Sequence, residues 1–140
     1  MDLTVWKASM EDIDAILLSE DLFDDPPRRE WTEEVLSDPR HHLVLAAMGM
    51  RLVGFLSAVH YLHPDKAPQM WINELGVVED QRRKGVARRL VDLAAGTAQG
   101  LGCSAIWVLS DPTVEALGFY TALGWHREGD HVAMFTRDLP

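Results

Sequence analysis

The stretch MWINELGVVEDQRRKGVARRL, residues 70–90, joins two different patterns of apolar residues. Its first half, MWINELGVV, is a run of apolar and β-branched residues with the length of one strand. After Gly85 the apolar residues recur at helical spacing, which predicts a helix ending near residues 100–102. Residues 104–110, SAIWVLS, predict another strand. A strand, a helix and a strand over residues 70–109 require two parallel strands, because parallel neighbours need a long crossover.

The rest of the chain predicts strands and helices that complete one sheet. Ser9 begins a helix with a capping-box pattern, and this helix is expected to end near FDDPP because Pro26-Pro27 cannot continue it. We expect an α/β (α+β) fold with one mixed, twisted sheet, helices on both faces, and a single domain over residues 1–140. The other predicted elements are strands at 3–8, 42–47, 52–60 and 131–139, and helices at 30–36 and 113–123.

The turn at Gly85 concentrates positive charge. Residues 81–89 hold five of the 13 basic residues and no acid, in a chain whose net charge is −9. The first backbone N–H groups of the following helix have no internal acceptors, so together with the helix dipole they form an anion site. Gly85 lets the backbone approach a ligand closely. The alternative is a solvated basic surface, but basic residues at a helix N-terminus are disfavoured unless an anion neutralises them.

Composition excludes several classes of function. The 47% apolar and 25% charged content is that of a globular chain, and no apolar run approaches the roughly 20 residues of a membrane helix. The start carries no secretory pattern, and the single Cys103 allows no internal disulfide, so a cytoplasmic location is expected. Net acidity argues against binding to nucleic acid, which requires many cationic contacts to phosphates.

Two segments resemble a known family. Residues 82–87, RRKGVA, resemble the [Q/R]-x-x-G-x-[G/A] pyrophosphate signature of the GNAT (Gcn5-related N-acetyltransferase) superfamily. Residues 119–125, FYTALGW, are similar to the F-Y-x-x-x-G-[FW] segment near the C-terminal end of that family. The order of strands and helices also agrees. Within the superfamily, INELGVVEDQRRKGVA and SDPTVEALGFYTALGWHRE resemble the small aminoglycoside N-acetyltransferases that modify a 3-amino group.

The resemblance implies acetyl-CoA as cosubstrate. Its pantetheine arm is expected to pair with the edge of the 70–78 strand through backbone groups of Leu75 and Val77. Its pyrophosphate is expected on the loop and first helical turn, whose residues are Arg82, Arg83, Lys84, Gly85, Val86 and Ala87.

Glu74 and Tyr120 are the predicted catalytic residues. Glu74 interrupts an apolar strand, and burial would raise its pKa toward the range of a general base. The alternative is a carboxylate at the sheet surface or paired with an arginine. Tyr120 matches a family tyrosine and, protonated at neutral pH, can donate a proton to the thiolate of the coenzyme. The alternative is a core tyrosine. A backbone N–H of Leu75 or Gly76 is expected to stabilise the oxyanion.

Acidic residues are the predicted contacts of a cationic acceptor. Residues 10–40 hold eleven of the 22 acids, which favours electrostatic steering of a polycation. The predicted acceptor contacts are Asp21, Asp24, Asp25, Glu74 and Asp111, with Asp130 as a weaker addition. No metal site is expected, because His60 and His63 lead into a proline-containing loop that carries no further ligand.

The sequence therefore predicts an enzyme that transfers acetyl from acetyl-CoA to a primary amine in a ternary complex. The preferred acceptor is the 3-amino group of an aminoglycoside. The alternatives are a peptide N-terminus, a lysine or a polyamine, or a non-catalytic module that binds acyl-CoA as a sensor. Glu74 and Tyr120 count against the sensor, which needs neither. The resemblance also implies a homodimer, since dimers are frequent in the family.

Overall fold

The computed structural model describes residues 2–129 and 132–140. The chain divides into two compact units, Met1–Leu109 and Ser110–Pro140. The first unit contains β1 (Leu3–Lys7), η1 (Met10–Asp12), α1 (Ile13–Leu17), α2 (Arg29–Ser37), β2 (His41–Met48), β3 (Arg51–Tyr61), β4 (Gln69–Val77), η2 (Glu79–Gln81), α3 (Val86–Gly100) and β5 (Ala105–Val108). The second unit contains α4 (Val114–Ala122).

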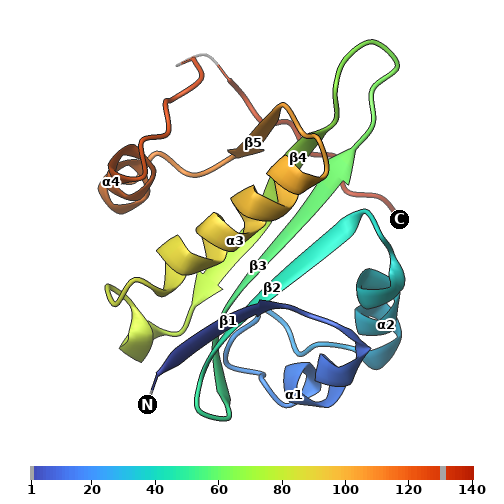
Figure 1. The fold of residues 1–140 in the computed structure, drawn as a ribbon, viewed down its shortest axis with the longest axis vertical. Helices are drawn as coiled ribbons and strands as arrows, with labels where there is room; N and C mark the ends of the chain where they lie inside the picture. Colours follow the sequence, from blue (N-terminus) through green and yellow to red (C-terminus); the bar gives the residue numbers. More distant parts are fainter. Residues whose placement is uncertain (1, 130–131) are drawn as a thin grey trace. The chain divides into compact units, whose positions relative to one another are not determined.

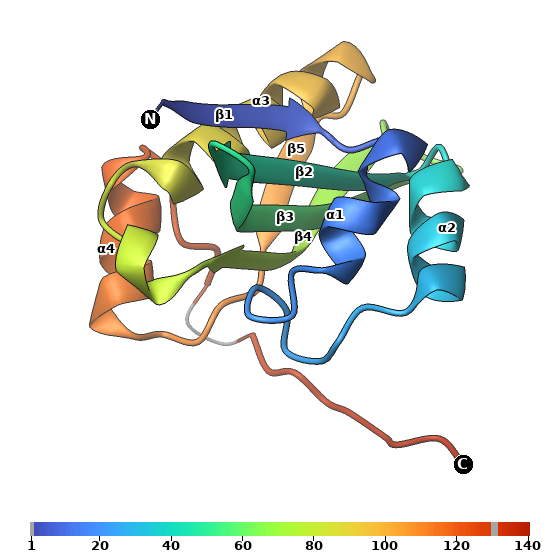
Figure 2. The ribbon, with the colours of Figure 1, turned by 90° about the horizontal axis from the view of Figure 1, so that it is seen from below.

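The first unit is built on one five-stranded sheet. Its strands lie in the order β1-β2-β3-β4-β5, with α3 lying across them (Figure 1). The first four strands pair antiparallel in sequence order, and β4 pairs with β5 in parallel. Figure 2 shows β1 to β4 side by side in this order. The mixed sheet and the parallel strands around the crossover helix are confirmed.

Neighbouring residues of β3 show what covers each face of the sheet. A Cβ on Gly54 would lie 2.9 Å from Val86 and 3.1 Å from Leu90, so Gly54 faces α3. The next residue, Phe55, points to the other face because side chains alternate along a strand. Its ring centroid lies 4.5 Å from that of Phe23, in the segment between α1 and α2. The prediction of helices on both faces is therefore confirmed.

The core lies mainly between α3 and the sheet. The apolar face predicted for the helix after Gly85 is buried, with Val86, Leu90, Ala94 and Ala98 all at 3% exposure or less. The strand residues buried with them include Val44, Leu56, Met70 and Ile72. Each Å² of apolar surface removed from water stabilises the fold by about 25 cal/mol, so this layer is the main stabilising element of the unit.

The N-terminal helical segment is shorter than predicted. The capping box exists, since Asp12 Oδ2 accepts from the Ser9 N–H at 2.8 Å and Ser9 Oγ accepts from the Glu11 N–H at 3.4 Å. However, α1 ends at Leu17, well before the two prolines. The Ser19 hydroxyl donates to the Ala15 carbonyl at 2.7 Å, and the chain then turns. The turn buries Leu22 and brings Phe23 onto Phe55, which a continued helix could not do.

The second unit differs from prediction at its end. Helix α4 begins as expected, with the Thr113 hydroxyl accepting from the Ala116 N–H at 3.1 Å. The predicted strand over residues 131–139 is wrong in its described part, because residues 132–140 form neither strand nor helix. A strand requires a ladder partner as well as a local pattern, and Phe135 is 92% exposed. Asp130 and His131 lie outside the described residues.

Among the described residues, no helix has both the length and the apolar character needed to cross a membrane.

Candidate active site

An irregularity in β4 determines where Glu74 lies. Ser57 of β3 pairs with Glu74, but the next residue, Ala58, pairs with Ile72. Two residues of β4, Asn73 and Glu74, therefore stand opposite one residue of β3, which is a β-bulge. The bulge shifts the alternation of side chains by one position from Glu74 onward.

The bulge turns Glu74 away from α3. Residues paired across a ladder share a face, so Leu75 lies on the α3 side with Leu56. Glu74 lies with Ser57 on the opposite side, the side of Phe55. The side chain of Glu74 is exposed there. The prediction that Glu74 is buried is therefore wrong, because a regular strand would have directed Glu74 into the core and the bulge does not.

The backbone of β4 beyond the bulge presents hydrogen-bonding groups at an edge of the sheet. The Val78 N–H donates to the Val53 carbonyl of β3 at 2.9 Å. Because the backbone groups of successive residues in an antiparallel ladder point to opposite sides, the N–H and C=O of Val77 point away from β3. Consistent with this, the Val77 carbonyl accepts from Arg82 Nε at 3.1 Å. Leu75, two residues earlier, has the same orientation as Val77. The N–H of Gly76 points instead toward β3.

This edge is open within the first unit because β5 pairs with β4 only up to the bulge. The last parallel pair is Ile72 with Val108. Among the described residues of this unit, no strand pairs with Leu75 or Val77 on that side. The two backbones predicted to bind pantetheine thus lie together at one unpaired edge, next to Arg82.

The turn at Gly85 has the backbone geometry of an anion site. Gly85 has φ +82° and is the residue before α3, and Arg83 has φ +62°, which is uncommon for a residue with a Cβ. When left-handed residues alternate with other conformations before a helix, the successive backbone N–H groups point toward one spot, where an anion can bind. No side chain of the described residues caps α3, and its first turn carries no acid. Among the described residues no side chain therefore accepts from the first N–H groups of α3, and three exposed basic side chains, Arg82, Arg83 and Lys84, precede them in the chain.

The predicted acceptor contacts of the N-terminal segment are exposed, and one of them is paired. Asp24 and Asp25 are exposed. Asp21 accepts from Arg51 at 3.4 Å, and Arg51 also contacts both carboxylate oxygens of Asp80, at 2.9 and 3.2 Å. Arg51 holds the pKa of the Asp80 carboxyl below its usual range. Asp21, Arg51 and Asp80 line an open cavity of about 440 Å³ together with Val78 and Glu79.

Tyr120 and Asp111 belong to the second unit. Tyr120 lies on α4, with ring centroids 5.0 Å from Phe119 and 5.4 Å from Trp125. Burial raises the pKa of its hydroxyl above the ordinary value, so the group stays protonated at neutral pH. Asp111 is exposed, and its carbonyl accepts from the Thr113 N–H at 2.8 Å in the turn before α4.

Comparison with known proteins agrees with this geometry. A family model described as the acetyltransferase (GNAT) family matches residues 7–125, which is most of the chain. The chain belongs to this acetyltransferase family. Its predicted activity as an N-acetyltransferase is thereby confirmed. No curated protein sequence matches it.

Solved structures similar to this acetyltransferase share its fold at low sequence identity. An aminoglycoside acetyltransferase from an uncultured soil metagenomic sample, in complex with sisomicin, has a TM-score of 0.88 and 19% identity, covering 99% of this chain and 97% of its own. AAC(6')-Iy in complex with the bisubstrate analog CoA-S-monomethyl-acetylneamine has a TM-score of 0.79 and 19% identity, covering 100% of both chains. A ribosomal-protein-alanine N-acetyltransferase from Brucella melitensis biovar Abortus 2308 has a TM-score of 0.74 and 18% identity, covering 98% and 99%.

Sequence reasoning missed Asn73 and Arg51 in this acetyltransferase. The bulge at Asn73 follows from the strand pairing and leaves no clear signal in the sequence. Apolar residues occupy both even and odd positions on each side of it, at 70–72 and at 75, 77 and 78. Arg51 has no signal either, because its partners are 29 and 30 residues away in the chain.

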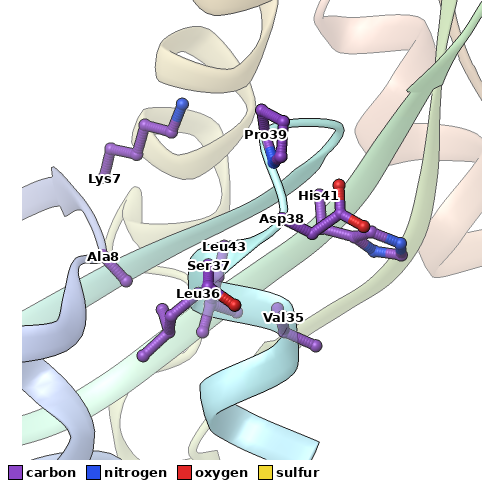
Figure 3. A pocket seen from close by; sticks show the side chains of 9 residues that line it. All are labelled: Lys7, Ala8, Val35, Leu36, Ser37, Asp38, Pro39, His41 and Leu43. Atoms are coloured by element: carbon purple, nitrogen blue, oxygen red, sulfur yellow. The ribbon is translucent and has the colours of Figure 1, made fainter.

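Two features of this acetyltransferase lie apart from the predicted site. A pocket of about 110 Å³ between the end of β1, the end of α2 and the start of β2 is lined by none of the predicted site residues (Figure 3). Within residues 2–129 and 132–140, no group of three or more His, Cys, Asp or Glu side chains is arranged to hold a metal ion. His60 instead lies 2.8 Å from the buried His42, through Nδ1 and Nε2.

Proposed function

We propose that this acetyltransferase moves an acetyl group from acetyl-CoA to a primary amine of an aminoglycoside, with the 3-amino group as the preferred position. The observation that carries the proposal is the bulge at Asn73. It places the Glu74 carboxylate on one face of β4 directly beside the open backbone edge of Leu75 and Val77. An acceptor bound on that face and acetyl-CoA bound along that edge would therefore meet at Glu74.

The donor site consists of the edge and the turn. The backbone groups of Leu75 and Val77 bind the pantetheine amides as an added strand would. The N–H groups from Arg83 to Ala87 bind the pyrophosphate, since they are left without acceptors at the start of α3. The exposed side chains of Arg82, Arg83 and Lys84 add positive charge around it.

Acetyl transfer needs three functions from the chain. Glu74 takes a proton from the ammonium of the acceptor, directly or through water, so that the lone pair of the resulting neutral amine forms the new C–N bond. The Leu75 N–H donates to the carbonyl oxygen as it becomes negative, a role that suits Leu75 because the Gly76 N–H points toward β3. Tyr120 donates its proton to the departing thiolate, and the second proton that the nitrogen loses as the amide forms restores the phenol, directly or through water. The products are the amide and CoA with its thiol protonated.

Two kinds of observation support a polycationic acceptor. The carboxylates of Asp24 and Asp25 are exposed on the segment that contacts the Phe55 face, the face that carries Glu74. Such a group of negative charges attracts a polycation and raises its rate of encounter. The similar solved structures include one in complex with sisomicin and one in complex with the bisubstrate analog CoA-S-monomethyl-acetylneamine. Asp111 is proposed as a further acceptor contact from the second unit.

Release of free thiol from acetyl-CoA tests the proposal. The acceptors to compare are aminoglycosides, a linear polyamine and a peptide with a free N-terminus. We expect release that depends on the aminoglycoside, and loss of that release when the 3-amino group is blocked. If thiol release is lost when the 6'-amino group is blocked, and not when the 3-amino group is blocked, the 6'-amino group is the acetylated position. Coenzyme binding without release by any acceptor would favour the sensor.

A further inference from the structure

An aromatic cluster lies on the same face of the sheet as Glu74. Trp71 of β4 and Trp107 of β5 are direct partners in the parallel ladder. Their rings are stacked, with centroids 5.8 Å apart and planes inclined by 16°. The ring of Tyr61, at the end of β3, packs edge to face on that of Trp107, with ring centroids 6.4 Å apart and ring planes at 90°. We call Tyr61, Trp71 and Trp107 the aromatic platform.

The register places the platform beside Glu74. Val59 pairs with Trp71. Val59 lies an even number of positions from Phe55 and Ser57 on β3, so it shares their face, and Trp71 therefore lies on the face opposite α3. In a regular strand, Trp71 and a residue three positions later would lie on opposite faces. The bulge at Asn73 removes that difference. Trp71 and Glu74 therefore lie on one face of β4, with the exposed Asn73 between them in the chain.

The burial of the platform is unlike that of the core. Met70 and Ile72, which flank Trp71 on the strand and face α3, are both 0% exposed. Tyr61, Trp71 and Trp107 are all partly exposed, although they are the largest side chains of their strands. Three aromatic rings that keep exposed surface next to an exposed carboxylate form a surface suited to a ligand with both apolar and cationic parts.

We propose that the aromatic platform binds the acceptor by stacking and thereby selects amines carried on a saturated ring over amines on a linear chain. The flat face of a saturated ring removes more apolar surface from water against stacked indoles than a flexible chain does. A second ammonium group on the ring is attracted to the indole faces. A linear chain loses more conformational freedom on binding. This selection rests on the proposed function, because it concerns the acceptor side of the same reaction.

The variant Trp107→Leu tests the platform, with an aminoglycoside and spermidine as the two acceptors. We expect KM for the aminoglycoside to rise about tenfold or more, with kcat changed little, and KM for spermidine to stay within about twofold. Trp107→Phe keeps a ring at the site and is expected to restore most of the aminoglycoside KM. Trp31→Leu is the matched control, since Trp31 is 59% exposed on α2 outside the platform.

A binding measurement separates this proposal from the proposed function. Titration of aminoglycoside into Glu74→Gln enzyme is expected to change tryptophan fluorescence, and the change should be lost in Glu74→Gln, Trp107→Leu enzyme. This readout remains even if the wild-type enzyme acetylates none of the amines, an outcome that would refute only the proposed function. Equal rises in KM for both acceptors, or an unchanged aminoglycoside KM in Trp107→Leu, would overturn the platform.

Discussion

Glu74 stands opposite Ser57 in the ladder between β3 and β4, one residue out of step with the pair formed by Ala58 and Ile72. This single irregularity has two consequences. It exposes a carboxylate that a regular strand would bury, and it coincides with the point where β5 stops pairing with β4. The proposed donor edge, general base and aromatic platform all meet there.

The close contact of Gly76 with Phe55 predicts a clear loss of stability in Gly76→Ala. The added Cβ would lie 2.7 Å from Phe55 Cε1, and the Phe55 ring also packs on Phe23, with ring centroids 4.5 Å apart. We expect the free energy of unfolding to fall by about 1–3 kcal/mol, measured by urea denaturation. Gly96→Ala on α3 is the matched control. Nothing lies within 4 Å of its added Cβ, so it should stabilise by about 0.5–1 kcal/mol. Two variants of equal stability would contradict the packing described here.

The left-handed conformation of Gly85 predicts a loss of coenzyme affinity in Gly85→Ala. With φ at +82° an alanine is strained by roughly 1–2 kcal/mol, although no atom obstructs its Cβ. Relief of that strain would turn the N–H groups of the loop away from the pyrophosphate, so we expect the Kd for CoA to rise about tenfold. Calorimetric titration measures it.

Gly102 provides the control for that experiment. It has φ +80° and open space around its Cβ, but it follows the C-terminal end of α3. Gly102→Ala should therefore cost about the same stability and leave the Kd for CoA unchanged. A similar rise in Kd in both variants would mean that general strain, not the anion site, affects binding.

His42 predicts a loss of stability in mild acid. It is 2% exposed, and burial lowers its pKa to about 4, with Lys7, His60 and His41 adding to the effect. Because the unfolded chain binds this proton at a higher pH than the folded chain does, stability falls as the pH drops from about 6.5 to about 4. The loss should be on the order of 2 kcal/mol. It is measured as the urea midpoint at a series of pH values.

His42→Gln should show a flatter dependence of stability on pH over that range, whatever its absolute stability. His126→Gln is the control, since His126 is exposed. If the curves of wild type and His42→Gln run parallel between pH 6.5 and 4, the buried histidine does not cause the loss.

Tyr120→Phe tests the proposed acid. The variant keeps a ring against Phe119 and Trp125 but loses the hydroxyl. We expect kcat to fall about 100-fold, with the Kd for CoA within about twofold. Because burial raises the pKa of Tyr120, its deprotonation should not limit the wild-type rate below about pH 9. Wild-type turnover in Tyr120→Phe would reduce Tyr120 to a packing residue.

Local patterns in the sequence predicted most of the fold. The change from a strand pattern to a helical pattern around Gly85 located β4 and α3, and Ser9 located the start of the first helical segment. Both depend on interactions between residues close in the chain, such as caps and the spacing of apolar side chains. The strands 3–8, 42–47 and 52–60 were located for the same reason.

Features that depend on distant residues were predicted wrongly or missed. The burial of Glu74 was wrong because a bulge arises from pairing between two strands. The strand at 131–139 was wrong in its described part because a favourable pattern does not supply a partner. The early end of α1 follows from the packing of Phe23 on Phe55, which lies 32 residues later in the chain.

Glu74→Gln is the most direct test of the central claim that the bulge presents the general base at the transfer site. Rates of thiol release with saturating aminoglycoside and acetyl-CoA should fall about 10²–10⁴-fold, while the Kd for CoA stays within about twofold. Glu34→Gln, an exposed glutamate on α2, should leave both values unchanged. Turnover of Glu74→Gln at the wild-type rate would contradict the account.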